Sequence, residues 1–317
     1  MSRYTVRPLD LDSLRTVSLR ARGGKVRAAD FARPYRKGEG VAGFLDGLPH
    51  ILAGDSVRAV IAAVQAAREH GKPVIWALGG HVIKCGLAPV LIELMSRRYA
   101  TAFAMNGAAS IHDFEIALAG HTSEEVEAVL PDGTFGSAEE TGREMNRALA
   151  AGEGVGAGEA LGCALDELAD SQFADKSLLL QAWRRSVPVT VHIAIGTDTP
   201  HTHPAVDPDA LGRSTHHDFR LFCSLVSALN EGGVYINCGS AVIMPEVFLK
   251  AVSAVRNLGI PLAEFTTVNL DFLQHYRPRV NVVERPHITA GGHGYSLTGH
   301  HELMLPLIAA ALIEHDA

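Results

Sequence analysis

Residues 73–119 read PVIWALGGHVIKCGLAPVLIELMSRRYATAFAMNGAASIHDFEIALA, and this stretch decides the fold. It holds two continuous apolar runs, PVIWALG and YATAFAM, and each is followed by a glycine-containing turn and then by helical spacing of apolar residues. Strands that are apolar along their whole length are typical of a parallel sheet with helices on both faces. The stretch therefore predicts an α/β protein with a single doubly wound, Rossmann-like parallel sheet.

The same alternation continues outward from this stretch. A helix is predicted before it at 55–70, and further elements follow at 187–196 (strand), 216–230 (helix), 234–239 (strand), 245–257 (helix) and 265–270 (strand). We interpret the glycine-rich sequence AGEGVGAGEALG at 151–162 as a surface loop rather than a domain boundary. Residues 45–317 are therefore expected to form a single domain.

A basic N-terminal arm, residues 1–44, precedes this domain. Residues 1–38 carry ten lysines and arginines against three aspartates, in a chain whose net charge is −7, so the rest of the chain is strongly acidic. Nucleic-acid binding is not favoured, because no aromatic interleaving or known nucleic-acid module accompanies the charge. We expect the arm to pack on its own acidic body or on a neighbouring subunit.

The composition is that of an ordinary globular protein. The chain has 317 residues, 47% of them hydrophobic, and its four cysteines lie far apart without a C-x-x-C spacing, which favours reduced thiols. The longest apolar run, 303–313, is broken by Pro306 and is too short to span a bilayer. The first residues contain no apolar signal core. We expect a soluble cytoplasmic protein with no membrane partner and a small-molecule substrate.

Polar residues cluster where the predicted strands end. The clusters are Gly79–His81 with Lys84, Asn106–Gly107 with His112 and Asp113, Asp198–His203, Asn237–Ser240 and Asn269–Asp271. In parallel α/β sheets ligands bind beyond the carboxyl ends of the strands, where loops and helix N-termini gather. The sequence therefore predicts an active-site crevice at this edge of the sheet.

The cluster after the strand at 187–196 contains Asp198, His201 and His203. These side chains could supply nitrogen and oxygen ligands to a metal such as zinc and leave a position open for water, as in a metal-dependent hydrolase or lyase. Alternatively, they could bind substrate or carry protons, because an unperturbed imidazole titrates near pH 6.5. A third interpretation is a solvated loop with no catalytic role.

Two adjacent-histidine pairs are further candidates. His216 and His217 are predicted to open a helix, and because neighbouring side chains point differently, at most one of them serves as a catalytic base. The polar segment GGHGYSLTGHHE at 291–302 places His301 and Glu302 just before a C-terminal helix. There the carboxylate is either a helix cap or a catalytic group.

A family resemblance extends this interpretation, although no G-x-G-x-x-G or Walker A motif follows the first predicted strand. Four segments, in order, resemble the NAD-contact and active-site segments of deoxyhypusine synthase: AMNGAASIHDFEIALAG (104–120), SVPVTVHIAIGTD (186–198), VYINCGSAVIMPEVF (234–248) and FTTVNLDF (265–272). That family cleaves spermidine by NAD-dependent dehydrogenation and transfers an aminobutyl group to a protein lysine. The resemblance implies a Rossmann-like fold, NAD as cofactor, a transferase activity and a homotetramer with sites at subunit interfaces.

The resemblance also implies roles for strand-end residues. Cofactor contacts are expected at Gly80, Asn106, Gly107, Asp113, Gly239, Ser240, Thr267, Asn269 and Asp271. Asp198 falls near the aspartate that follows the family's central strand, and His216 or His217 falls near its active-site histidine.

The sequence departs from the family at one position. Ile243 stands where the resemblance places the family's nucleophilic lysine, after a glycine-rich turn. Without an amine there, the covalent imine of that route does not form. The sequence therefore favours an NAD-dependent, deoxyhypusine synthase-like enzyme that acts on a small polar substrate, such as an amine, by transient hydride transfer. The alternatives are the metal-dependent hydrolase or lyase and a non-catalytic NAD-binding protein.

Overall fold

Six parallel strands form one sheet in the computed structural model, which describes residues 3–289 and 291–316. The strands are β1 (Val74–Leu78), β2 (Ala102–Asn106), β3 (Val189–His192), β4 (Val234–Cys238), β5 (Thr266–Asp271) and β6 (His293–Thr298). They lie in the order β3-β2-β1-β4-β5-β6, and every pairing is parallel. This is the strand order of a doubly wound Rossmann-like sheet, so the predicted fold class is confirmed.

The central strands are apolar because helices cover both of their faces. In β1, Trp76 pairs in register with Phe103 of β2 and with Ile236 of β4, and every residue of the strand is buried. Side chains alternate along a strand, so Trp76 joins the core on one face of the sheet and Ile75 joins the core on the other. This double burial produces the continuous apolar runs of the sequence.

The helices divide between these two cores. The first core receives α2 (Leu52–Glu69), α4 (Ala88–Ser96), α5 (Gly107–Ala119), α8 (Ala157–Leu168), α9 (Leu178–Arg184) and α13 (His301–Ile313). The second receives α10 (Pro208–Ser227) and α11 (Ile243–Asn257). The first core also receives residues of α1 (Gly40–Asp46), α3 (Gly80–Lys84) and α7 (Glu139–Ala151), and Ala210 and Leu211 from the start of α10. The other helical segments described are α6 (Val126–Val129), α12 (Tyr276–Pro278), the π-helix η5 (Arg279–Glu284) and the short turns η1 (Ala28–Asp30), η2 (Leu130–Asp132), η3 (Ala174–Lys176), η4 (Thr199–Thr202) and η6 (Arg285–His287).

The sequence analysis missed strand β6. This strand lies at the edge of the sheet and pairs only with β5, and among its six residues only Leu297 is buried. An edge strand with one covered side needs few apolar residues, so its sequence has the polar, glycine-containing composition of a loop.

We expected the glycine-rich segment at 151–162 to be a surface loop, and this holds only for residues 152–156, which join α7 to α8 with Glu153 and Gly154 exposed. Its second half forms the start of α8, and the glycines are there because neighbouring groups come very close. A Cβ atom on Gly158 would lie 2.0 Å from the carbonyl oxygen of Val189, and one on Gly162 would lie 2.8 Å from the Cβ of Trp183. Glycine therefore lets α8 pack directly against β3 and α9.

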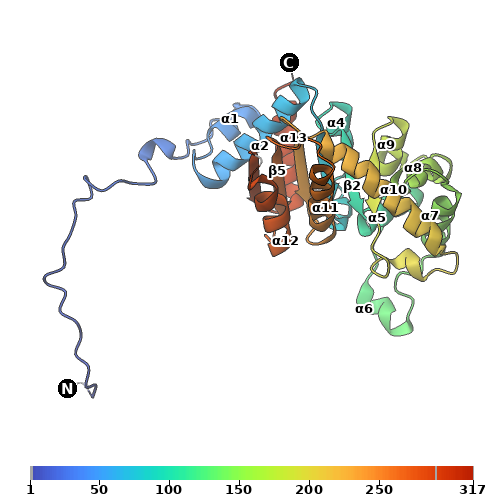
Figure 1. Cartoon of the computed structure of the whole chain (residues 1–317), viewed down its shortest axis with the longest axis horizontal. Helices are drawn as coiled ribbons and strands as arrows, with labels where there is room; N and C mark the ends of the chain where they lie inside the picture. The colour runs from blue at the N-terminus through green and yellow to red at the C-terminus, as the bar shows by residue number, and fades with distance from the viewer. Residues whose placement is uncertain (1–2, 290, 317) are drawn as a thin grey trace.

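Residues 3–39 lead into α1. Their first part, 3–27, runs away from the body of the molecule as the extended trace in Figure 1, whereas Asp30 and Arg33 contact the body: the Asp30 carbonyl accepts from the amide of His50 and the Arg33 amide donates to the carbonyl of Gly47, both at 2.9 Å. Within this stretch the described secondary structure is the single turn η1. Tested over residues 3–289 and 291–316, the helices are all too short or too polar to cross a bilayer. The division at residue 44 between arm and domain stays a prediction.

Candidate active site

The strand order reverses between β1 and β4, and two glycine loops meet at this switch point. The amide of Gly79 donates to the carbonyl of Cys238 at 2.9 Å. A Cβ atom on Gly79 would lie 2.0 Å from the carbonyl oxygen of Gly239, whose own φ is +70°. Both positions therefore require glycine, and the crevice outside these strand ends is the expected ligand site of the fold.

The loop after β1 continues against helix α5. Gly80 and Gly239 are half-buried, so their backbone is accessible from the crevice. A Cβ atom on Gly80 would lie 3.0 Å from the Cβ of Ala108 and 3.3 Å from the Cδ2 of His112. Two of the predicted cofactor-contact glycines thus lie at the switch point, and each adjoins a histidine, because a Cβ atom on Gly239 would lie 3.0 Å from Cε1 of His301.

Asn106 and Gly107 form the turn from β2 into α5. Asn106 caps the helix, because its side-chain oxygen accepts from the amide of Ala109 at 2.9 Å. The Asp198 carboxylate lies over the next residue, at 1.9 Å from the position that a Cβ on Gly107 would occupy. A carboxylate is favourable there because the first amides of a helix carry partial positive charge.

Asp198 keeps unused hydrogen-bonding capacity. Its Oδ2 atom is buried and has no hydrogen-bond partner among residues 3–289 and 291–316. Burial raises the pKa of this carboxyl, and His201 and the Thr197 hydroxyl oppose that change. A buried carboxylate with an unpaired oxygen is costly, so this group is suited to a cationic or hydrogen-bond-donating ligand.

A cavity of about 1090 Å³ opens beside Asp198. It is bounded by α5, α7 and the segment between α5 and α6, and Ala108 and Lys84 line the side nearest the switch point. Its ionisable lining residues are five carboxylates against two cations: Glu115, Glu124, Glu140, Glu144 and Asp198 against Lys84 and Arg143. This excess of negative charge favours cationic ligands.

His112 lines the same cavity and belongs to a chain of hydrogen bonds. The Thr122 hydroxyl donates to Glu115, so it accepts from Nδ1 of His112, which lies 2.7 Å away. This assigns the imidazole proton to Nδ1 and leaves Nε2 as an acceptor. Burial lowers the pKa of His112, with Glu115 opposing, so the ring is neutral at pH 7. A neutral imidazole with a free Nε2 is able to act as a general base.

His301 lies on the other side of the switch point, at the first position of α13. It is fully buried, and neither ring nitrogen has a hydrogen-bond partner in the described chain. Its Nε2 lies 3.7 Å from Oδ1 of Asp271, and its ring is 5.7 Å from those of His81 and Phe272. Burial lowers the pKa of His301, and the Asp271 carboxylate opposes this.

The alternative metal site at Asp198, His201 and His203 is not assembled. His203 turns away, with Nε2 3.1 Å from Glu139 and Nδ1 accepting from the amide of Ala205. Nδ1 of His201 accepts from the Gly196 amide. In the described part of the chain, the group of three possible ligands whose atoms lie within 4.8 Å of one another is instead His81, Cys85 and Glu302.

His216 and His217 do not open a helix. Helix α10 begins eight residues earlier at Pro208, where the Asp207 side chain caps it, so both histidines lie in its interior. His216 is exposed and lines a second cavity of about 380 Å³ together with His192 and Ile243. His217 is half-buried, and its Nδ1 has no partner among the described residues. Neither lines the larger cavity.

Asp113 and Thr267 lie away from the crevice. Asp113 is fully buried and accepts from the Ser177 hydroxyl at 2.6 Å and from the amides of Leu178 and Leu179 at 2.7 and 2.9 Å. These bonds fasten the start of α9. Thr267 is buried in β5, where its hydroxyl donates to the carbonyl of Val282. The contacts of both residues are within the protein.

Asn269 and Ser240 are buried near the carboxyl ends of β5 and β4. Asn237 donates to the side-chain oxygen of Asn269 at 2.7 Å and to the carbonyl of Ser240 at 2.9 Å. The Ser240 hydroxyl accepts from the amide of Met244 at the start of α11. These side chains fix the β4 and β5 loops against each other.

Cys85 and Glu115 were not predicted as site residues, and His81 and His112 were predicted only as members of the strand-end polar clusters, without a role. The i, i+4 spacing of His81 and Cys85 was visible, and so was the position of His112 after a strand-end turn. Their partners, however, come from distant segments, which no local pattern identifies.

Comparison with solved structures identifies the fold. A structure from Entamoeba histolytica that is assigned as a deoxyhypusine synthase superposes with a TM-score of 0.52 and 12% sequence identity. The match covers 89% of this chain and 97% of that chain. A conserved protein assigned as LOR/SDH from Methanococcus maripaludis S2 superposes with a TM-score of 0.53 and 15% sequence identity. The match covers 84% of this chain and 71% of that chain. AgrE in ternary complex with ornithine and NAD⁺ superposes with a TM-score of 0.54 and 14% sequence identity. The match covers 85% of this chain but only 35% of AgrE, so this chain spans about a third of the length of AgrE.

These identities are low, so the likeness is one of fold. No protein-family profile matches the sequence, and no curated protein sequence matches it either.

Proposed function

From the deoxyhypusine synthase-like fold of this chain, we propose an NAD-dependent enzyme that oxidises a small cationic amine. The observation that carries the proposal is the unpaired Asp198 carboxylate beside an acid-rich cavity at the carboxyl edge of a Rossmann-ordered sheet. NAD⁺ supplies a hydride acceptor when it is bound. AgrE, which shares the fold, has been crystallised with NAD⁺ and the diamino acid ornithine.

The glycines of the switch point fit a dinucleotide. Gly80 and Gly239 are half-buried, and the close contact between Gly79 and Gly239 requires glycine where the two loops meet. Backbone amides without a side chain above them suit close approach of a pyrophosphate. Gly80 would hold the cofactor, whereas Gly239, whose amide already donates to the carbonyl of Leu270, would provide only space. The side chains of Asn106 and Ser240 fix the neighbouring loops through their bonds to the amides of Ala109 and Met244.

Asp198 and His112 divide the work on the substrate. Asp198 binds a cationic group of the substrate, because its Oδ2 lacks a partner in the described chain. His112 accepts a proton from the reacting amine at Nε2, and the Thr122–Glu115 chain stabilises the imidazolium that forms. Loss of that proton and of a hydride from the adjacent carbon leaves an imine. His216 and His217 stay predicted bases, as do His301 and Glu302 as predicted catalytic groups.

The exposed arm supports a homo-oligomer. Leu9, Leu14 and Leu19 are 83, 64 and 75% exposed, and apolar side chains spaced along an extended segment suit packing on another subunit. The homotetramer implied by the family resemblance would make use of this surface. Light-scattering mass of the full chain tests it, and a monomeric mass would contradict it.

Calorimetric titration of the chelator-treated full chain with NAD⁺ is the first test. Saturable binding, followed by NADH formation when diamines or diamino acids are added, is the result expected of this function. No heat of binding at several temperatures would contradict it and would favour a metal-dependent reaction. Asp166→Asn, an exposed substitution on α8, is a matched control for variants at Asp198.

A further inference from the structure

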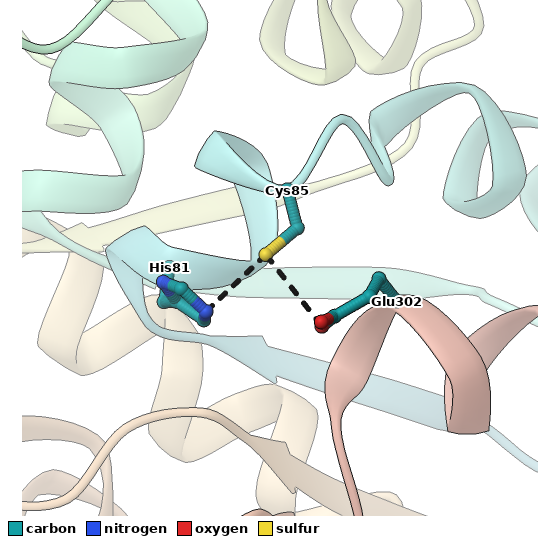
Figure 2. A group of neighbouring side chains, drawn as sticks. All are labelled: His81, Cys85 and Glu302. Carbon is teal, nitrogen blue, oxygen red and sulfur yellow. Dashed lines mark hydrogen bonds between the residues drawn. The ribbon is translucent and has the colours of Figure 1, made fainter.

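His81, Cys85 and Glu302 form a compact group at the same edge of the sheet, as Figure 2 shows. Nε2 of His81 lies 3.3 Å from Sγ of Cys85, and Sγ lies 3.9 Å from Oε2 of Glu302. His81 and Cys85 come from α3 and its C-cap, whereas Glu302 comes from the first turn of α13, 217 residues away. All three ligand atoms lie within 4.8 Å of one another.

These separations are close to those of a tetrahedral zinc site. Zn–S bonds of about 2.3 Å and Zn–N or Zn–O bonds of about 2.1 Å place neighbouring ligand atoms roughly 3.3–3.6 Å apart. The separation of His81 from Cys85 is at the lower limit of that range, and the separation of Cys85 from Glu302 lies above it. Glu302 is exposed, so rotation of its side chain can close the remaining distance without disturbing the core.

The scaffold holds the two ligand-bearing segments in place. Val82 and Ile83, between the two α3 ligands, are fully buried, and the amide of Cys85 donates to the carbonyl of His81 at 2.9 Å. One helical turn thus places both side chains on the same face. On the other side, His301 next to Glu302 is fully buried. Little ordering is left for the ligand to impose, which favours binding.

We propose that His81, Cys85 and Glu302 bind a zinc ion through one nitrogen, one sulfur and one oxygen. Three protein ligands are the number found in catalytic rather than structural zinc sites, so the fourth position is free for water or a substrate donor atom. The Cys85 thiol gives up its proton when it binds the ion. Lys84, between the two α3 ligands, lines the Asp198 cavity, so this site borders the proposed substrate site.

The test uses the full chain, stripped of metal by a chelator, and two ions. Zn²⁺ is titrated in competition with a chromophoric chelator, and Co²⁺ reports a thiolate ligand through its near-ultraviolet charge-transfer band. One Zn²⁺ per chain and a cobalt–thiolate band are expected. Cys85→Ser should remove the band, and Cys85→Ser and Glu302→Gln should each weaken Zn²⁺ binding about tenfold or more. Cys163→Ser, an exposed cysteine on α8, should change neither.

Two outcomes would overturn the site. The first is equal Zn²⁺ affinity of wild type and Cys85→Ser, and the second is the absence of a cobalt–thiolate band in wild type. Either result would mean that Cys85 is not a metal ligand and only forms a hydrogen bond with His81. Thermal melting of each variant shows that it is folded, and Glu302→Gln is an exposed change that leaves the core intact. NAD⁺ titration of the same samples separates this inference from the proposed oxidation, since either can fail alone.

Discussion

Asp113, fully buried within α5, and Asp198, half-buried beside the start of α5, are used by the structure in opposite ways. Burial raises the pKa of Asp113 to about 6, while the Ser177 hydroxyl and the amides of Leu178 and Leu179 partly offset this. Burial also raises the pKa of Asp198, but its Oδ2 has no partner in the described chain. The comparison teaches that burial of an ionisable group does not by itself mark a site. Spare hydrogen-bonding capacity does.

The largest effect is expected at His112, which faces the Asp198 cavity. His112→Gln removes the proton acceptor but keeps a polar side chain of similar length, so kcat for amine oxidation should fall by about 10²–10⁴-fold. NAD⁺ affinity should stay the same, because the variant leaves the glycine loops intact. Steady-state kinetics with calorimetry checks both. His121→Gln, which changes an exposed residue of the same cavity, is the control. An unchanged kcat in His112→Gln would remove this residue from the mechanism.

The next largest effect is expected at Asp113, whose carboxylate is bonded within the protein. Asp113→Ala leaves the hydroxyl of Ser177 and the amides at the start of α9 without their acceptor, at a cost of about 3 kcal/mol in the free energy of unfolding. The melting temperature should fall by roughly 6–12 °C for a domain of this size. Asp175→Ala, an exposed change in the neighbouring turn η3, should melt like wild type. A variant of Asp113 with normal melting and weakened NAD⁺ binding would instead restore its predicted cofactor role.

A smaller effect is expected for Asp198→Asn. The substitution keeps the shape of the side chain and removes its charge, so the substrate loses a charge-assisted hydrogen bond worth about 1.5–3 kcal/mol. The KM for the amine should therefore rise by roughly 10–100-fold, with little change in melting temperature. Kinetics with a cationic amine and a neutral alcohol of the same length measures this. Equal losses on both substrates would contradict a role in recognising positive charge.

The smallest effect is on the pH profile. Burial lowers the pKa of His112 from its ordinary value of 6.5, so the free base persists to lower pH than for an exposed histidine. At pH 6.5 the enzyme should keep more than half of its maximal kcat, and the acidic decline should lie below that pH. The decline should be absent from the residual activity of His112→Gln. If the midpoint of the acidic decline in kcat lay above pH 6.5, the decline would have to be assigned to another group.

Much of the fold could be predicted from the local sequence pattern. The double burial of β1 and β4 makes their sequences continuously apolar, and the glycine and asparagine residues that end the strands mark the carboxyl edge. Strand β6 was missed because an edge strand need not be apolar. The start of α8 lies within the stretch 137–170 that was predicted to be helical, but its glycines were interpreted as a loop, whereas they serve close packing. In each case a tertiary contact decided what the local pattern could not.

The sequence by itself determined the alternation of strands and helices, the parallel sheet and the edge at which ligands bind, because these follow from residue periodicity along a single segment. Only the tertiary structure decided which polar side chains are free. In the tertiary structure the Asp113 carboxylate accepts hydrogen bonds from the amides at the start of α9, whereas Oδ2 of Asp198 is unpaired within the described residues. The fold also brings Glu302 next to Cys85, which is 217 residues away in the sequence. The reason is physical: whether a polar group is satisfied depends on partners that reach it through the fold, and these partners leave no trace in its neighbouring residues.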